Sequence, residues 1–328
     1  MIQSSEDTKS TIKTEAPVDP AIGTAEEVEK EKATLEKGMA PLATTKRPFK
    51  SRKRKEQWGS LFTYLLLILV SIVLLLPLVW MVSTSLKPMS EIAQFPPSLF
   101  PVDIQWNNYL DMMNAFPFFK YAGNTLLITV FVVAGNIISN SFIAYGFAKI
   151  NFPGKSVLFA MVLSTMMIPG FVTMIPQYIL FSRIGWVGTY LPLIVPAFFG
   201  NAFNIFLMRQ FYLSIDDELI EAAQMDGANH LFIWSRLMIP LTKPALITIG
   251  ITSFNGAWND FLGPLLYIQN EDRYTLQIGL QVFQNQSTTQ WNYLMAGATL
   301  VLLPTVLLFL VAQKYFIEGM DLSGGMKG

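Results

Sequence analysis

The chain has 328 residues, of which 52% are hydrophobic and 14% are charged, and its 23 basic residues balance its 23 acidic ones. A soluble domain carries about a quarter of charged residues, so this composition favours an integral membrane protein, and the zero net charge gives no case for nucleic-acid binding. Without cysteine, and with His230 as the only histidine, the chain cannot build a disulfide framework, a thiolate metal site or a His-based zinc site.

The first 45 residues are polar and contain no aromatic side chain. Such a segment buries too little apolar area to offset its ordering entropy, so we expect a disordered cytosolic tail, and its polar start argues against a signal peptide. Seven Lys and Arg residues follow between Lys46 and Lys55. We interpret this basic run as a topology signal next to the membrane. The tail and its basic run therefore cover residues 1–56, and residues 57–328 form a transmembrane domain.

Six apolar stretches are long enough to cross about 30 Å of hydrocarbon, which takes about 20 helical residues. They are Gln57–Leu86, Tyr121–Ala148, Ser156–Ser182, Ile184–Met208, Pro244–Ile268 (through Asp260) and Tyr293–Gln313. Pro169-Gly170 breaks the third stretch, and Pro192 and Pro196 lie in the fourth. These residues are candidate kinks beside a pathway, or ordinary kinks and helix ends.

The distribution of Lys and Arg predicts the orientation of these spans. With the basic run in the cytosol, six crossings leave seven further cationic positions inside and only Lys87, Lys120, Arg183 and Arg273 outside. Both termini are therefore expected in the cytosol. The segment from Lys87 to Lys120 is the largest external one, and its proline and aromatic content predicts a structured flap on the outer membrane surface.

The connection between the fourth and fifth spans, residues 210–244, is the longest cytosolic one, and we call it the docking segment. Ser214 is a candidate N-cap for a first helix with an acidic first turn, and Gly227 can take the left-handed conformation that ends it. Asn229 can cap a second short helix, which Pro240 and Pro244 then terminate.

An amphipathic helix lying on lipid is the alternative interpretation of the docking segment. Its first helix is acidic, however, and the inner leaflet is anionic, so a protein partner is the better explanation. Glu221 and Asp226 can form charge-assisted hydrogen bonds to a basic groove, and Ala222 and Ala223 allow close approach.

This segment resembles the cytoplasmic "EAA" motif, Glu-Ala-Ala-x-x-Asp-Gly-Ala, of ATP-binding-cassette importer permeases. The matching residues are Glu221, Ala222, Ala223, Asp226, Gly227, Ala228, Pro240 and Pro244. The runs Pro240–Leu246, Trp258–Phe261 and Gly324–Gly328 are similar to the carbohydrate-uptake branch, the relatives of the maltose permease subunits. The resemblance covers roughly residues 58–328, and it departs at Trp234, where the family often has phenylalanine.

The resemblance implies an all-α integral membrane fold with six transmembrane helices of the type I importer architecture and a cytosolic coupling helix. It implies a multi-pass protein of the bacterial inner (plasma) membrane whose partners are a second homologous permease subunit, two ATP-binding cassette ATPase subunits and an extracytoplasmic solute-binding protein. ATP and Mg are then expected on the ATPase subunits, and this chain is expected to hold no cofactor or metal and to catalyse no reaction.

The sequence itself lacks a phosphate-binding loop. Gly154-Lys155-Ser156 matches only the last three residues of the Gly-x-x-x-x-Gly-Lys-Ser/Thr pattern, because Lys149 stands where the first glycine is needed. One alternative to the importer is an ion-coupled secondary carrier. Such a carrier needs carboxylates within the membrane, and Asp260 is the only one within the predicted spans. A structural membrane scaffold is another alternative, and it would have no use for asparagines within the spans.

Polar residues within the spans are the candidates for a substrate path, because they are costly in lipid and usually face the bundle interior. On the fifth span Asn255, Trp258, Asn259 and Leu262 follow helical spacing, with Asp260 beside them. Asn136 and Asn140 on the second span and Asn201 and Asn204 on the fourth complete the set. Neutral amides and a stacking indole suit an uncharged sugar or oligosaccharide, although such amides also hold helices together.

Overall fold

The computed structural model describes residues 50–284 and 289–324, so most of the expected tail and the residues 325–328 lie outside it. The regular elements among the described residues are all helices, with no β-strand, which confirms the all-α prediction. The longer helices are α2 (Lys50–Ser85), α5 (Phe118–Lys149), α6 (Lys155–Ser164), α7 (Gly170–Arg183), α9 (Ala202–Leu213), α10 (Asp217–Met225), α13 (Lys243–Trp258) and α16 (Trp291–Gly324). Short helices are α3 (Met89–Ile92), α4 (Asn107–Asn114), α8 (Leu191–Ile194), α11 (His230–Phe232), α12 (Ile239–Leu241), α14 (Leu262–Tyr267) and α15 (Leu276–Gly279).

The chain divides within α2 into two units, with the boundary between Val70 and Ser71. In the first unit, the described residues 50–70 are helical, so the last residues of the expected tail form the first turns of α2. The second unit contains the rest of α2 and all the helices that follow it.

Four helical segments among the described residues are long and apolar enough to cross a membrane: Phe62–Ser85, Phe118–Lys149, Leu191–Leu213 and Trp291–Lys314. Two further segments are bent pairs, in which Lys155–Met167 meets Gly170–Arg183 at 101° and His230–Leu241 meets Lys243–Trp258 at 83°. Counting each pair as one span gives six, so the described chain has four to six spans. The bend next to Pro169 confirms the predicted break in the third stretch.

Two predicted spans have different ends in the structure. The fourth begins at Leu191 rather than Ile184, because the chain turns at Gly185 and Gly188, both of which have positive φ. The fifth was predicted as one helix to Ile268, but α13 ends at Trp258 and α14 is a separate helix. Asp260 lies in this break, and its Oδ1 accepts the backbone N–H of Gly263, three residues further on, at 3.0 Å, as in a helix-capping contact.

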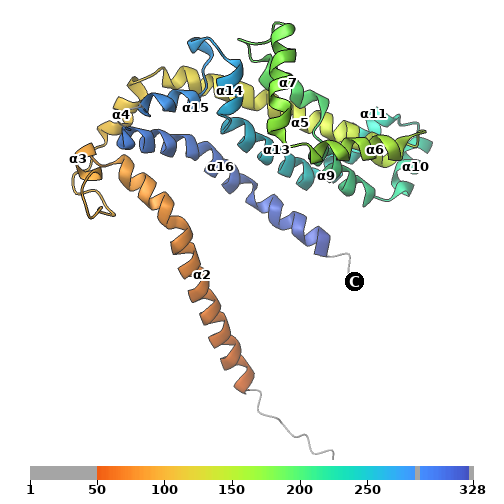
Figure 1. The fold of residues 1–328 in the computed structure, drawn as a ribbon. Coiled ribbons are helices and arrows are strands. Elements are labelled where there is room, and N and C mark those ends of the chain that lie inside the picture. The colour runs from red at the N-terminus through yellow and green to blue at the C-terminus, as the bar shows by residue number, and fades with distance from the viewer. Residues whose placement is uncertain (1–49, 285–288, 325–328) are drawn as a thin grey trace, which may run out of the picture. The chain divides into compact units, whose positions relative to one another are not determined.

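Helix α5 is the central helix of the second unit, and α9 and α13 pack along it (Figure 1). At the end of α5 near Lys149, a buried apolar cluster joins these three helices to the docking segment. Its fully buried members include Ala144, Met208, Ile233 and Ile249. At the other end of α5, a second cluster joins α4, α15 and α16 to the last turn of α13. Both ends of α5 are therefore fixed by packing.

The segment between α2 and α5, which the distribution of Lys and Arg predicts to be external, is structured, as expected. Glu91 is buried, and its carboxylate accepts the Ser98 hydroxyl at 2.7 Å and the Val102 backbone N–H at 3.1 Å. The Ser98 hydroxyl is the main reason why the pKa of Glu91 lies below its ordinary value, followed by the Val102 and Asp103 N–H groups and Lys87, with burial opposing them. Lys87 is also buried and donates to the Ser98 carbonyl.

Candidate functional site

The first helix that lies wholly within the docking segment is α10, whose N-cap is Asp216. The predicted N-cap Ser214 is wrong, because α9 extends to Leu213 and the Ser214 hydroxyl donates to the Phe211 carbonyl at 2.8 Å. Asp217 and Glu218 lie in the first turn of α10, where the helix dipole favours negative charge. The predicted acidic first helix is therefore present but starts two residues later.

The turn after α10 follows the prediction. Gly227 has a φ of +85°, in the left-handed region, and its N–H donates to the Gln224 carbonyl at 2.9 Å. Asn229 then caps the next helix, because its side-chain oxygen accepts the Phe232 N–H at 2.8 Å. Helix α11, a π-helical turn (Ile233–Met238) and α12 follow without a break. The chain enters α13 through the 83° bend next to Pro244.

Helix α10 has one buried side and one exposed side. Ile220 is buried in the apolar cluster near Lys149, and Ala223 and Ala228 pack against that cluster. Glu221, Ala222 and Asp226 are exposed. The acidic residues of the motif are therefore exposed to solvent, while the opposite side of α10 packs against the apolar cluster.

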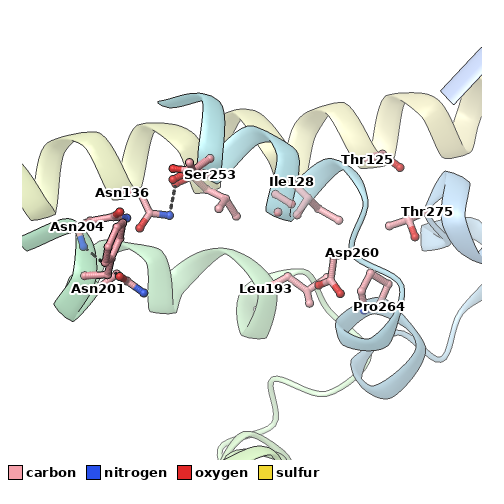
Figure 2. A pocket seen from close by; sticks show the side chains of 15 residues that line it. Thr125, Ile128, Asn136, Leu193, Asn201, Asn204, Ser253, Asp260, Pro264 and Thr275 are labelled. Atoms are coloured by element: carbon pink, nitrogen blue, oxygen red, sulfur yellow. Dashed lines mark hydrogen bonds between the residues drawn. The ribbon is translucent and has the colours of Figure 1, made fainter. Parts of the chain in front are cut away.

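A cavity of about 500 Å³ lies between α5, α9 and α13, and Figure 2 shows it from close by. Helix α5 contributes Thr125, Ile128, Val132 and Asn136 to its lining, and the fourth span contributes Leu193, Asn201, Phe203 and Asn204. The other lining residues are Thr252, Ser253, Gly256, Ala257, Asp260, Pro264 and Thr275.

The break before α9 places Asn201 at this cavity. Gly200 has a φ of +91°, and a Cβ there would lie 2.8 Å from the Ile143 side chain and 3.0 Å from that of Ile205. Only glycine fits such a close approach in this conformation. The N–H of Asn201 then donates to the Asn140 side-chain oxygen at 2.6 Å. The break is thus hydrogen-bonded to α5 at Asn140, one helical turn from the lining residue Asn136.

The polar lining consists of amides and hydroxyls, and among the residues that the structure describes Asp260 is the only charged one that lines the cavity. The Thr275 hydroxyl is buried and has no hydrogen-bond partner among the described residues. A solute with several hydroxyl groups can therefore find both donors and acceptors in this cavity.

The predicted path residues divide into two groups. Asn136, Asn204 and Asp260 line the cavity together with Asn201. Asn140 is fully buried, and its amide joins the Asn136 carbonyl to the N–H of Asn201, which favours a role in holding helices together.

The remaining predicted residues lie on other sides of α13. Trp258 is buried, stacks on Phe254 at 5.5 Å and donates its indole N–H to the Val301 carbonyl at 2.9 Å. These contacts favour packing over stacking on a solute. Asn255 and Asn259 are exposed, and the Asn259 amide donates to the Asn255 side chain at 2.8 Å. Leu262 does not continue their helical face, because it begins α14.

The sequence analysis did not identify the cavity face of α13, which is formed by Thr252, Ser253, Gly256 and Ala257. Small residues at this helical spacing were the available signal. Asparagine and tryptophan side chains instead mark the adjacent face of α13, at Asn255 and Trp258. Thr125 and Thr275 were also missed.

Comparison with known proteins gives consistent matches. Residues 140–321 match the family model "Binding-protein-dependent transport system inner membrane component". The chain is 32% identical over 277 residues to "Probable ABC transporter permease protein YurM" of Bacillus subtilis (strain 168), covering 84% of this chain and 91% of that protein. It is also 32% identical over 267 residues to "Arabinooligosaccharides transport system permease protein AraQ" of the same organism, covering 80% and 94%.

A solved structure shows the same fold. It is titled "Crystal structure of a bacterial ABC transporter involved in the import of the acidic polysaccharide alginate", and one of its chains matches with a TM-score of 0.70 and 28% identity. The match covers 82% of this chain and 100% of that chain.

Proposed function

The chain belongs to the family of binding-protein-dependent transport system inner membrane components, and we propose that it forms half of the translocation path of an ATP-driven importer for an uncharged sugar or oligosaccharide. The family places it among the permease subunits of sugar ABC importers, which are multi-pass membrane proteins and not enzymes. Energy must therefore come from another subunit.

The docking segment is the proposed contact with that subunit. The observation that carries this proposal is α10, which exposes Glu221, Ala222 and Asp226 while its other side is buried against the membrane helices. A basic cleft on an ATPase subunit fits this acidic surface through charge-assisted hydrogen bonds. When the ATPase subunits close on ATP, the cleft moves and carries α10 with it, and the spans switch access as rigid bodies.

The proposed cargo follows from the cavity lining. Amides and hydroxyls on α5, α9 and α13 can bond sugar hydroxyls in both directions. If Asp260 is ionised, an anionic group about 5 Å from it is repelled with an energy of about 3 kcal/mol, for an effective dielectric constant of about 20. An uncharged solute avoids this cost. The name of the AraQ relative, an arabinooligosaccharide permease, supports an oligosaccharide as the cargo.

The proposed assembly contains a second homologous permease subunit, two ATPase subunits that bind ATP and Mg, and an extracytoplasmic solute-binding protein. The excess of Lys and Arg on one side of the predicted spans supports cytosolic termini. The exposed Asn255 and Asn259 would face the path where the two permeases meet.

The test is uptake of labelled oligosaccharides into proteoliposomes that contain the chain and its co-purified partners. Uptake is expected to require ATP inside and the binding protein outside. Glu221→Lys is expected to abolish uptake while the chain still inserts into the membrane. Uptake driven by an ion gradient without ATP would contradict the proposal and support a secondary carrier.

A further inference from the structure

The last turns of α5 form hydrogen bonds to the docking segment on both sides of α10. The part of the segment before α10 is its entering limb, and the part after α10 is its leaving limb. Tyr145 and Lys149 lie four residues apart, so they project from the same face of α5 on successive turns. Lys149 contacts the limb that enters α10, and Tyr145 contacts the limb that leaves it. We call these two residues the α5 clamp.

The first contact is charge-assisted. The Lys149 side chain is only 3% exposed, and its Nζ donates to the Ile215 carbonyl at 2.5 Å and to Asp217 Oδ1 at 2.6 Å. Because the ammonium group is buried against the protein, these two acceptors replace its lost water contacts. The backbone immediately before α10 is thereby bonded to the end of α5.

The second contact joins a buried tyrosine to the only histidine of the chain. The Tyr145 side chain is 2% exposed, and its hydroxyl lies 2.9 Å from Nδ1 of His230. His230 begins α11, directly after the Gly227 turn. The limb that leads towards α13 is therefore also bonded to α5.

Helix α5 can carry a movement from this clamp to the cavity. It is one uninterrupted helix without proline from Phe118 to Lys149. Asn136 lies 13 residues from Lys149, or about 20 Å at 1.5 Å per residue, and Thr125 lies about 36 Å away. Both residues line the cavity. A displacement of α10 that is transmitted to α5 thus moves one wall of the cavity.

We propose that Tyr145 and Lys149 are positioning residues that couple the docking segment to α5, so that its movement reaches the cavity wall. This inference rests on the proposed function, because it presumes that an ATPase subunit moves α10. The clamp acts after docking, and it is separate from the exposed residues of α10 that would touch the ATPase.

The experiment measures ATP hydrolysed per solute imported by the whole reconstituted complex. Tyr145→Phe removes one hydrogen bond and keeps the ring, and Lys149→Met removes the charged donor and keeps the apolar stem. Each variant is expected to hydrolyse ATP at a near-normal rate while importing less, raising the ratio at least about threefold. The rise should be larger for Lys149→Met, because its bonds are charge-assisted.

Tyr212→Phe is the matched control. Tyr212 packs edge-to-face against Tyr145 at 6.3 Å, but its buried hydroxyl lies beside Ser141, Trp234 and Thr242 and takes part in neither contact of the clamp. Removing this hydroxyl should leave the ratio unchanged. His230→Phe should reproduce the effect of Tyr145→Phe, and the double variant should be no worse than either single one, since both remove the same bond.

The outcomes separate the clamp from the proposed function. An unchanged ratio in Tyr145→Phe and Lys149→Met complexes that bind the ATPase normally would overturn the clamp and leave the proposed function intact. Loss of ATPase binding in both variants would also overturn it, because the clamp is proposed to act after docking. A wild-type chain that binds no ATPase would instead overturn the proposed function.

Discussion

Substitutions of Gly227 test the turn after α10 in graded steps. The backbone conformation of Gly227 and the space around it have separate effects on each substitution. Its φ of +85° is unfavourable for a residue with a side chain, yet no atom lies within 4 Å of the position that a Cβ would occupy. The cost of Gly227→Ala is therefore conformational, about 1–2 kcal/mol. That cost lowers the population of the docking-competent turn by about 5- to 30-fold.

Two further substitutions extend the series. Gly227→Asn should be close to wild type, because asparagine tolerates the left-handed region. Gly227→Pro should abolish function, since proline fixes φ near −65° and removes the N–H that donates to the Gln224 carbonyl, at a cost of about 3 kcal/mol or more.

The assay is ATP-dependent uptake, with the amount of membrane-inserted chain measured in parallel. Uptake per inserted chain should fall in the order glycine, asparagine, alanine, proline. Equal uptake by the alanine and proline variants at wild-type level would refute the argument that the geometry of this turn matters.

Three other predictions test the cavity, the packing of α13 and the external segment. Trp258→Phe removes the indole hydrogen bond to the Val301 carbonyl and should lower stability by about 1–2 kcal/mol in a thermal unfolding assay. The KM for uptake should not change. A KM raised several-fold would instead show that Trp258 contacts the substrate. Asp260→Asn should change that KM by less than about threefold, or about 0.6 kcal/mol, and preserve ATP dependence, whereas an ion-coupled carrier would lose transport altogether. The pKa of Glu91 is lowered in the folded state, so its stabilisation is present above pH 4.5 and is lost as the pH falls below that value. Limited proteolysis of the external segment should show this pH dependence in the wild type and not in Glu91→Gln.

The spans and the docking turn could be predicted from the sequence because each depends on local chemistry. Long apolar runs locate α2, α5 and α16, and Gly227 and Asn229 have conformational preferences that the structure satisfies. Ser214 failed as an N-cap because the preceding helix extends up to it, and the apolar pattern did not reveal where α9 ends.

The cavity could be predicted only in part. Asn136 and Asn204 were found because amides in a span are conspicuous. The rotation of α13 about its axis depends on packing at both ends of the helix, and it turns Thr252 and Ser253, rather than Asn255, towards the cavity. That rotation is a tertiary property. The break at Asp260 was missed because a carboxylate that caps a helix within an apolar run looks like a polar residue inside a longer span.

The most direct test of the docking segment uses the fact that the chain contains no cysteine. Met225 is 89% exposed at the end of α10, and Phe119 is 78% exposed at the start of α5. Met225→Cys should cross-link to the ATPase subunit in native membranes and resist a membrane-impermeant maleimide applied from outside, while Phe119→Cys should show the reverse. Labelling of Met225→Cys from outside, or no cross-link to an ATPase in a transport-competent complex, would contradict the account.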